Sequence, residues 1–371
     1  MNEQNREPDL LSTSFRWNPR EYIETRLSEQ TPEPLFVSGD PTERTRQQEA
    51  LRERLRDLLS LPSQSEGLLN SQVLSTEEFP HYRREFVTFE SREGVTVCGF
   101  FLLPSSYSGN SYNGNSEESG SKPLSAVLCL PGHGRGVDPI LGILPDGSQR
   151  EWGQWDEYAN DYALQCVREG YAVFALEQVS FGRRRDAQAQ ASGNPDLSSC
   201  TRDAMAALML GETLPGWRVW DAMKAIDYLQ SRPEVDPDKI AVLGISGGGT
   251  ITLLTSCLDT RVSACVVSGY FNTFRDSILA VDHCVDNYIP NILQLCEMPE
   301  LAGLLAPRLF FAESGAQDPI FPLAGFEKAV TRTQEIYSLF GVKDHFGSEV
   351  FTGGHVFNGE GAFSFLKEKW R

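Results

Sequence analysis

The chain has 371 residues, of which 40% are hydrophobic, so it is long enough to form one large domain or two small ones with a substantial core. Its 51 acidic residues exceed its 33 basic residues and give a formal net charge of −18. Because a surface of this sign repels phosphate backbones and anionic membranes, the composition argues against nucleic acid and membranes as partners.

The N-terminal residues lack the apolar core, basic flank and small-residue cleavage site of a signal peptide, and no run reaches the roughly 18 apolar residues of a membrane span. Eight cysteines are scattered without CxxC spacing, and several lie in apolar runs such as AVLCL and SACVV. This pattern favours buried free thiols and a cytoplasmic location, with a disulfide between Cys284 and Cys296 left open as the alternative.

Residues 1–80 are polar and charged, and within them residues 41–62 place leucines such as Leu51, Leu55 and Leu58 at helical spacing. We therefore expect residues 1–80 to form a helical extension packed on a main domain of residues 81–371. A separate functional module in this region is the alternative.

Two runs with strand character follow, over residues 85–91 and 95–104, and the three residues between them end in Gly94. They predict a hairpin at the antiparallel edge of a sheet. The next segment, residues 105–122, consists mostly of Ser, Gly, Asn and Tyr. Since such a composition buries little apolar area, it predicts a surface loop.

From Leu124 onward, short apolar runs alternate with helical stretches. Strand-like runs cover residues 124–130, 171–177, 239–245, 262–270, 307–314 and 346–352, and helical stretches cover residues 155–170, 216–232, 249–258, 322–340 and 360–370. This rhythm predicts an α/β fold with a mostly parallel sheet and helices on both faces. Ligands of such sheets bind outside the carboxyl ends of the strands, so residues directly after the strands are the first candidates for chemistry.

The most informative of these positions is Ser246. Residues 244–248 read Gly-Ile-Ser-Gly-Gly and fit G-x-S-x-G between a strand-like run and a helix-forming run. A serine on such a turn is pushed outward with strained backbone angles, and the glycines are needed because a Cβ would collide with the strand or the helix. The segment matches neither G-x-x-x-x-G-K-[ST] nor G-x-G-x-x-G, which argues against a phosphate-binding turn.

A serine hydroxyl needs a base and a group that orients the base, and in this arrangement the chain order is Ser, then Asp or Glu, then His. His355 follows the last strand-like run after two glycines, and Asp318 follows the strand-like run before it. Asp318 could instead cap the next helix, and Glu313 is the competing acid. We expect Ser246, His355 and Asp318 to form the catalytic triad.

An ester hydrolase also needs two N–H donors for the oxyanion of its tetrahedral intermediate. The amide of Gly247, directly after the nucleophile, is the expected first donor. The second is expected from the glycine-rich loop Leu-Pro-Gly-His-Gly, where the amide of His133 or Gly134 is the candidate. The imidazole of His133 either contacts substrate or packs to shape this loop, and the sequence does not favour one over the other.

With these residues in view, residues 82–370 resemble the α/β-hydrolase superfamily and, within it, the bacterial dienelactone-hydrolase-like and acetyl-xylan-esterase-like branch. The resemblance lies in the LPGHG loop, the run of residues 216–249 around Ser246, the segment DHCVDNYIPNIL, the run LLAPRLFFAESGAQDPIFP and the GGH that ends at His355. It implies an eight-stranded sheet, a Ser-His-Asp triad and no metal or organic cofactor. Dienelactone hydrolases use a cysteine nucleophile, so Ser246 argues against that activity.

Loops between residues 136 and 155 and between residues 182 and 216 are the expected walls of the substrate pocket. Trp152, Trp155 and Phe181 lie in or beside them and are candidate pocket residues, although aromatic side chains belong more often to the core. The resemblance also implies that Glu177 and Arg183 brace the site.

These features together predict a serine hydrolase that cleaves small acyl or acetyl esters through an acyl-Ser246 intermediate, with a small-molecule ester as its substrate. A peptidase of the prolyl-oligopeptidase type is one alternative, but residues 1–80 are too few for the propeller that such enzymes usually carry. A binding protein that has lost turnover is the other alternative. The sequence specifies no oligomeric state.

Overall fold

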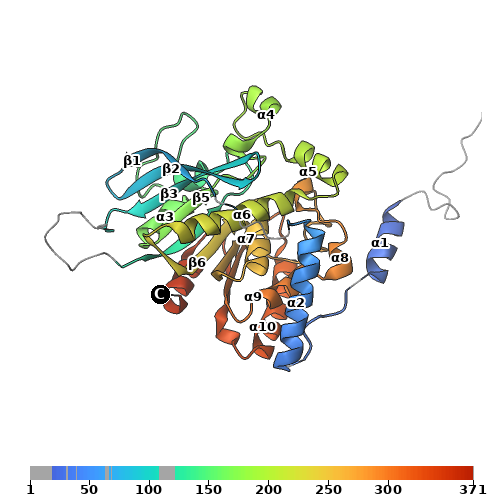
Figure 1. The fold of residues 1–371 in the computed structure, drawn as a ribbon. Coiled ribbons are helices and arrows are strands. Elements are labelled where there is room, and N and C mark those ends of the chain that lie inside the picture. The colour runs from blue at the N-terminus through green and yellow to red at the C-terminus, as the bar shows by residue number, and fades with distance from the viewer. Residues whose placement is uncertain are drawn as a thin grey trace, which may run out of the picture.

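A nine-stranded sheet forms the centre of the computed structural model, which describes residues 19–30, 32–38, 40–62, 67, 69–107 and 122–370 (Figure 1). The strand order is β1-β2-β3-β5-β4-β6-β7-β8-β9. The strands are β1 (Gln72–Glu78), β2 (Tyr82–Arg92), β3 (Val95–Pro104), β4 (Leu124–Leu130), β5 (Ala172–Leu176), β6 (Val235–Ile245), β7 (Val262–Ser268), β8 (Leu309–Gly315) and β9 (Phe346–Phe351).

The pairing confirms the mostly parallel sheet of the predicted α/β fold. Strands β5, β4, β6, β7, β8 and β9 pair in parallel, and β1, β2, β3 and β5 pair antiparallel. The predicted hairpin is the β2–β3 pair. The sheet has nine strands where the resemblance implied eight. The strand missing from the sequence prediction is β1, QVLSTEE. Its residues are all exposed, and its sequence lacks the alternation of apolar and polar residues that marks a half-buried strand.

Helices and short 3₁₀ turns connect the strands. The helices are α1 (Pro19–Glu29), α2 (Pro41–Leu58), α3 (Tyr162–Arg168), α4 (Ala187–Ala191), α5 (Cys200–Met209), α6 (Leu214–Ser231), α7 (Gly247–Leu258), α8 (Ile292–Leu295), α9 (Met298–Leu305), α10 (Leu323–Leu339) and α11 (Glu360–Lys369). The 3₁₀ turns are η1 (Pro139–Leu141), η2 (Gly182–Arg184), η3 (Val285–Asn287) and η4 (Lys343–His345).

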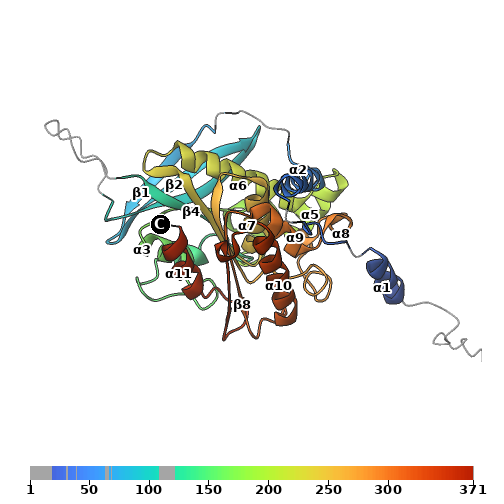
Figure 2. The ribbon, with the colours of Figure 1, turned by 90° about the horizontal axis from the view of Figure 1, so that it is seen from below.

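The sheet separates two hydrophobic clusters. Side chains of α2, α6, α7, α9 and α10 pack on one face, and those of α3 and α11 pack on the other. In β4, Ala126 and Leu128 point into the first cluster, whereas Val127 and Cys129 point into the second. Figure 2 shows α10 and α11 on opposite sides of β8. A strand buried on both faces explains why these runs are apolar throughout.

The N-terminal region contributes unequally to this core. Helix α2 packs against α7, α8 and α9, with Leu51 and Leu55 buried, whereas α1 has no buried residue. The division of the chain at residue 80 stays a prediction, and β1 lies on the N-terminal side of that boundary. Most of the predicted loop at residues 105–122 lies outside the described residues.

All eight cysteines are free thiols, and no helix in the described ranges has the length and apolarity of a membrane span.

Candidate active site

Ser246 lies on a tight turn between β6, which ends at Ile245, and α7, which begins at Gly247. Its backbone has φ 55° and ψ −124°, a strained conformation for a residue with a side chain. The glycines around it are required, because a Cβ on Gly248 would collide with the carbonyl of Leu130, and a Cβ on Gly244 would lie 2.7 Å from the same oxygen. The strand-turn-helix setting predicted from the sequence is therefore confirmed.

Asp318 and His355 meet at the carboxyl ends of β8 and β9. The two atoms Asp318 Oδ2 and His355 Nδ1 are 2.7 Å apart, so the imidazole donates to the carboxylate through Nδ1. The other oxygen of Asp318 accepts the amides of Ile320 and Phe321, both at 2.9 Å. Asp318 thus serves as a turn residue and as the partner of His355 at once. The ring of Phe321 stacks on His355 at 5.6 Å.

Ser246 and His355 line the same cavity, whose volume is about 330 Å³. Its lining consists of His133, Tyr158, Ser246, Asp282, His283, Cys284, Asn287, Ile320, Phe321 and His355. Ser246 is 7% exposed, and Nε2 of His355 is buried without a hydrogen-bond partner among the described residues. This nitrogen is therefore available to receive a proton inside the cavity.

Tyr158 is a cavity residue that the sequence did not indicate. Burial raises the pKa of its phenol to about 12, against the effect of its hydrogen bond with Ser246. It lies in residues 155–170, which were predicted to be helical throughout, but α3 begins only at Tyr162 because Asn160 and Asp161 adopt left-handed backbone angles. Turns before that point bring Tyr158 to Ser246.

Glu313, the competing acid, has a different position. It is completely buried at the end of β8, accepts the hydroxyl of Ser268 at 2.8 Å, and accepts the amides of Asn358 and Gly359, both at 2.9 Å. Burial raises the pKa of Glu313 to about 7, although these donors oppose the shift. Glu313 therefore anchors the loop that follows His355, and Asp318 is the acid that contacts the imidazole.

The candidate oxyanion donors lie beside Ser246. Gly247 is the first residue of α7, where a backbone N–H has no partner within the helix. A Cβ on Gly247 would lie 2.9 Å from Nδ1 of His133, so the loop after β4 approaches this amide closely. Gly134 has φ 121°, a conformation open to glycine. The assignment of the Gly247, His133 and Gly134 amides to an oxyanion site stays a prediction.

The imidazole of His133 lines the cavity and also contacts buried groups. Its Nε2 lies 3.0 Å from Oδ2 of Asp286, and its ring meets Phe181 edge to face at 4.8 Å. Burial lowers the pKa of His133, but the charges and hydrogen bonds of Asp286 and Cys200 together outweigh it, and the pKa rises to about 9. Both roles that the sequence left open, packing and exposure to substrate, fit this position.

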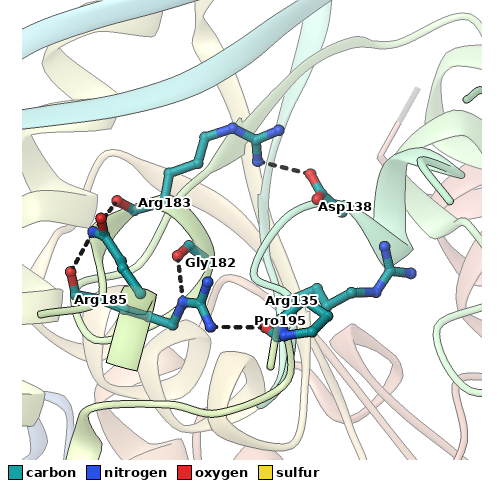
Figure 3. A pocket seen from close by; sticks show the side chains of 7 residues that line it. Arg135, Asp138, Gly182, Arg183, Arg185 and Pro195 are labelled. Carbon is teal, nitrogen blue, oxygen red and sulfur yellow. Dashed lines mark hydrogen bonds and ion pairs between the residues drawn. The ribbon is translucent and has the colours of Figure 1, made fainter. Parts of the chain in front are cut away.

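Glu177 and Arg183, which the resemblance implied to brace the site, contact each other, and their bracing role stays a prediction. They are 3.1 Å apart, and Arg183 also binds Asp138 at 2.7 Å. Glu177 is completely buried and accepts the amide of Val137 at 3.2 Å, which ties the loop after β4 to the end of β5. Arg183, Asp138 and Arg135 line a second cavity of about 440 Å³ (Figure 3).

The three aromatic pocket candidates lie away from the middle of the Ser246 cavity. Trp152 stacks on His81 at 4.7 Å and contacts Trp155 edge to face at 5.9 Å. Phe181 is completely buried between His133 and the guanidinium of Arg218. None of the three is among the residues that line the cavity in the described structure, and their role in substrate binding stays a prediction.

Glu177→Gln is expected to weaken the dependence of stability on pH. Burial raises the pKa of Glu177 from 4.5 to about 7, opposed by the charge of Arg183, so between these pH values the folded chain holds a proton that the unfolded chain releases. The free energy of unfolding therefore falls as pH rises through this window, and the substitution removes at most about 3 kcal/mol of that fall.

Urea denaturation of the wild type and Glu177→Gln at several pH values between 4.5 and 8 measures this difference. Glu368→Gln, at a residue whose side chain is 72% exposed, is the matched control and should follow the wild type. If the free energy of unfolding changed with pH in the same way in Glu177→Gln and in the wild type, Glu177 would already be ionised in the folded chain throughout this range.

Comparisons with known proteins agree with this fold. A family profile described as BAAT / Acyl-CoA thioester hydrolase C terminal matches residues 223–301. YtaP of Bacillus subtilis (strain 168), which is named as a hydrolase, is 28% identical over 247 residues, covering 63% of this chain and 73% of YtaP.

Two solved structures extend the likeness over most of the chain. A Bacteroides fragilis protein titled as an acetyl xylan esterase has a TM-score of 0.72 at 18% identity, covering 92% of this chain and 84% of its own. A glucuronoyl esterase from Solibacter usitatus has a TM-score of 0.63 at 16% identity, covering 90% and 94%. The chain therefore has the α/β-hydrolase fold, as the resemblance implied.

Proposed function

We propose that this protein is a serine hydrolase that cleaves carboxylic esters, with Ser246 as nucleophile, His355 as general base and Asp318 as the acid that orients it. One observation carries the proposal. The imidazole of His355, which has a hydrogen-bond partner in Asp318 at 2.7 Å, lines the same cavity as Ser246. The esterase names of the structural relatives support the same chemistry.

The reaction begins with attack of Ser246 Oγ on the ester carbonyl, while Nε2 of His355 takes the hydroxyl proton. Asp318 keeps the proton of His355 on Nδ1, so that Nε2 is the free acceptor, and it stabilises the imidazolium that forms. The amide of Gly247 and that of His133 or Gly134 donate to the oxyanion of the tetrahedral intermediate.

Collapse of this intermediate expels the alcohol, which receives its proton from Nε2 of His355, and leaves the acyl group on Ser246. A water molecule then loses a proton to the same nitrogen and attacks the acyl carbonyl. The second tetrahedral intermediate releases the carboxylic acid and returns the proton to Ser246. Burial of the cavity strengthens each of these electrostatic contributions.

A small acyl group is the expected substrate, because a cavity of about 330 Å³ has to hold part of the alcohol as well. Acetyl esters of carbohydrates and related small esters fit this description. The name of the matched family profile refers to thioesters, whose cleavage follows the same steps. The cytoplasmic location stays a prediction from the absence of a signal-like segment and from the free thiols.

Initial rates with p-nitrophenyl acetate, butyrate and octanoate test the proposal. The wild type is expected to favour the two short esters, and Ser246→Ala is expected to lose activity by about 10⁴-fold or more. Ser338→Ala, at an exposed serine of α10, is the matched control and should retain the wild-type rate. Equal slow rates in the wild type and Ser246→Ala would refute the esterase function and leave a peptidase or a binding protein as the alternatives.

A further inference from the structure

Four potential metal ligands converge beside the Ser246 cavity. They are His133 in the loop after β4, Cys200 at the start of α5, and Cys284 and Asp286 around η3. One ligand atom from each side chain lies within 4.8 Å of the ligand atoms of the other three. Cys200 and Asp286 are buried, whereas His133 and Cys284 line the cavity.

The contact between His133 and Asp286 already holds two of the potential ligands close together. Nε2 of His133 lies 3.0 Å from Oδ2 of Asp286, yet this buried nitrogen has no aligned hydrogen-bond partner in the described structure. In a tetrahedral zinc site, with bonds of about 2.0 Å to nitrogen and about 2.3 Å to sulfur, neighbouring ligand atoms lie roughly 3.3–3.8 Å apart. Shifts of about an ångström in the separations of the ligand atoms, with the His133–Asp286 pair widening and the longer separations shortening, would bring all four side chains to that geometry.

The surrounding charge suits a divalent cation. Two thiolates and one carboxylate carry a charge of −3, which a divalent ion reduces to −1. The guanidinium of Arg218 is almost completely buried and supplies the remaining positive charge. It donates to Oδ2 of Asp286 at 2.6 Å and to Sγ of Cys200 at 3.1 Å. Donors of this kind orient ligands from outside the coordination sphere.

We propose that His133, Cys200, Cys284 and Asp286 bind one thiophilic divalent cation of the zinc class. Two sulfurs, one imidazole nitrogen and one carboxylate oxygen form a tetrahedral set that selects zinc over magnesium or calcium. Because the protein supplies all four ligands, the site is closed and structural. The ion joins the loop after β4 to α5 and η3, and so holds the loop that carries the candidate oxyanion amides.

No sequence spacing marks this site, because the ligands come from three distant segments. The resemblance implied no metal, and all four residues lie outside the strands and helices predicted from the sequence. The sequence pointed to His133 as an oxyanion donor, a substrate contact or a packing residue, and to the two cysteines as free thiols or, for Cys284, as a possible disulfide partner of Cys296. The site is independent of the proposed esterase function, since its test below measures metal binding alone.

Titration of the full chain with Co²⁺, after treatment with a chelator and a thiol reductant, tests the site. The wild type is expected to bind one Co²⁺ per chain with a thiolate-to-cobalt absorption band and the visible bands of tetrahedral cobalt, and Zn²⁺ should displace it. Cys284→Ser is expected to raise the dissociation constant by about 10²-fold or more. Cys98→Ser, at a cysteine of β3 outside the cluster, is the matched control and should bind like the wild type.

His133→Ala provides a second variant in case Cys284→Ser does not fold, because His133 lies on a loop at the cavity wall. Zn²⁺ is also expected to raise the Tm of the wild type and of Cys98→Ser, but not that of either ligand variant. Absence of a thiolate-to-cobalt band in the reduced wild type, or equal affinity in the wild type and the folded ligand variants, would overturn the proposal.

Discussion

Replacement of His355 by alanine is expected to lower kcat for p-nitrophenyl acetate by about 10⁴- to 10⁶-fold, and Asp318→Asn by about 10⁴-fold. His355 is the only basic side chain of the cavity that hydrogen-bonds a carboxylate through Nδ1 and leaves Nε2 free, among the residues described. Without it, Ser246 has no group to take its proton. Asparagine at residue 318 would favour the wrong tautomer of the imidazole.

The effects of His355→Ala and Asp318→Asn on kcat are not expected to be additive. In the proposed mechanism His355 and Asp318 act as one unit, so the double variant should be about as slow as His355→Ala alone. His81→Ala, at an exposed histidine that stacks on Trp152, is the control for the loss of an imidazole. Full activity in His355→Ala, or a loss of equal size in His81→Ala, would contradict the assigned base.

Gly248→Ala is expected to lower the free energy of unfolding by about 3 kcal/mol or more, and to reduce ester hydrolysis as well. The added Cβ would collide with the backbone carbonyl of Leu130, which cannot move without displacing β4. Such a shift also moves Ser246 and the loop that begins at Pro131. The loss of stability and the loss of activity therefore share one cause, the separation of the turn from the neighbouring strand.

Urea denaturation measures this loss, and Gly67→Ala is the matched control. Among the residues that the structure describes, no atom lies within 4 Å of a Cβ on Gly67, and its φ lies outside the left-handed region, so this substitution should change the free energy of unfolding by about 0.5 kcal/mol or less. A Gly248→Ala variant with wild-type stability would mean that the turn and β4 adjust easily, contrary to the packing around Ser246.

Much of the sheet could be predicted because its strands are buried on both faces. The apolar runs at β4, β6 and β7 predict buried strands. The glycines around Ser246 indicate a strand-turn-helix element, because larger residues would not fit at those positions. The order of Ser246, Asp318 and His355 along the chain predicted a contact between the last two, and their hydrogen bond is present.

The remaining features depend on contacts that no local pattern encodes. Strand β1 is exposed throughout and lies at the edge of the sheet, where it pairs with β2 and where Glu77 binds Arg84. Helix α9 is buried on every side, so it lacks the polar face that marks an amphipathic helix in sequence. Tyr158 reaches the cavity because the backbone turns before α3, and only the folded chain brings Cys200 near Cys284.

Labelling with an organophosphonate, followed by mass analysis of the intact chain and of its peptides, is the most direct measurement of whether Ser246 is the nucleophile. The wild type is expected to gain one adduct per chain, on the peptide that contains Ser246. The adduct should be absent from Ser246→Ala and should form far more slowly in His355→Ala. A wild-type chain that stays unlabelled, or a label on any other residue, would contradict the assignment of Ser246 as the nucleophile of a serine hydrolase.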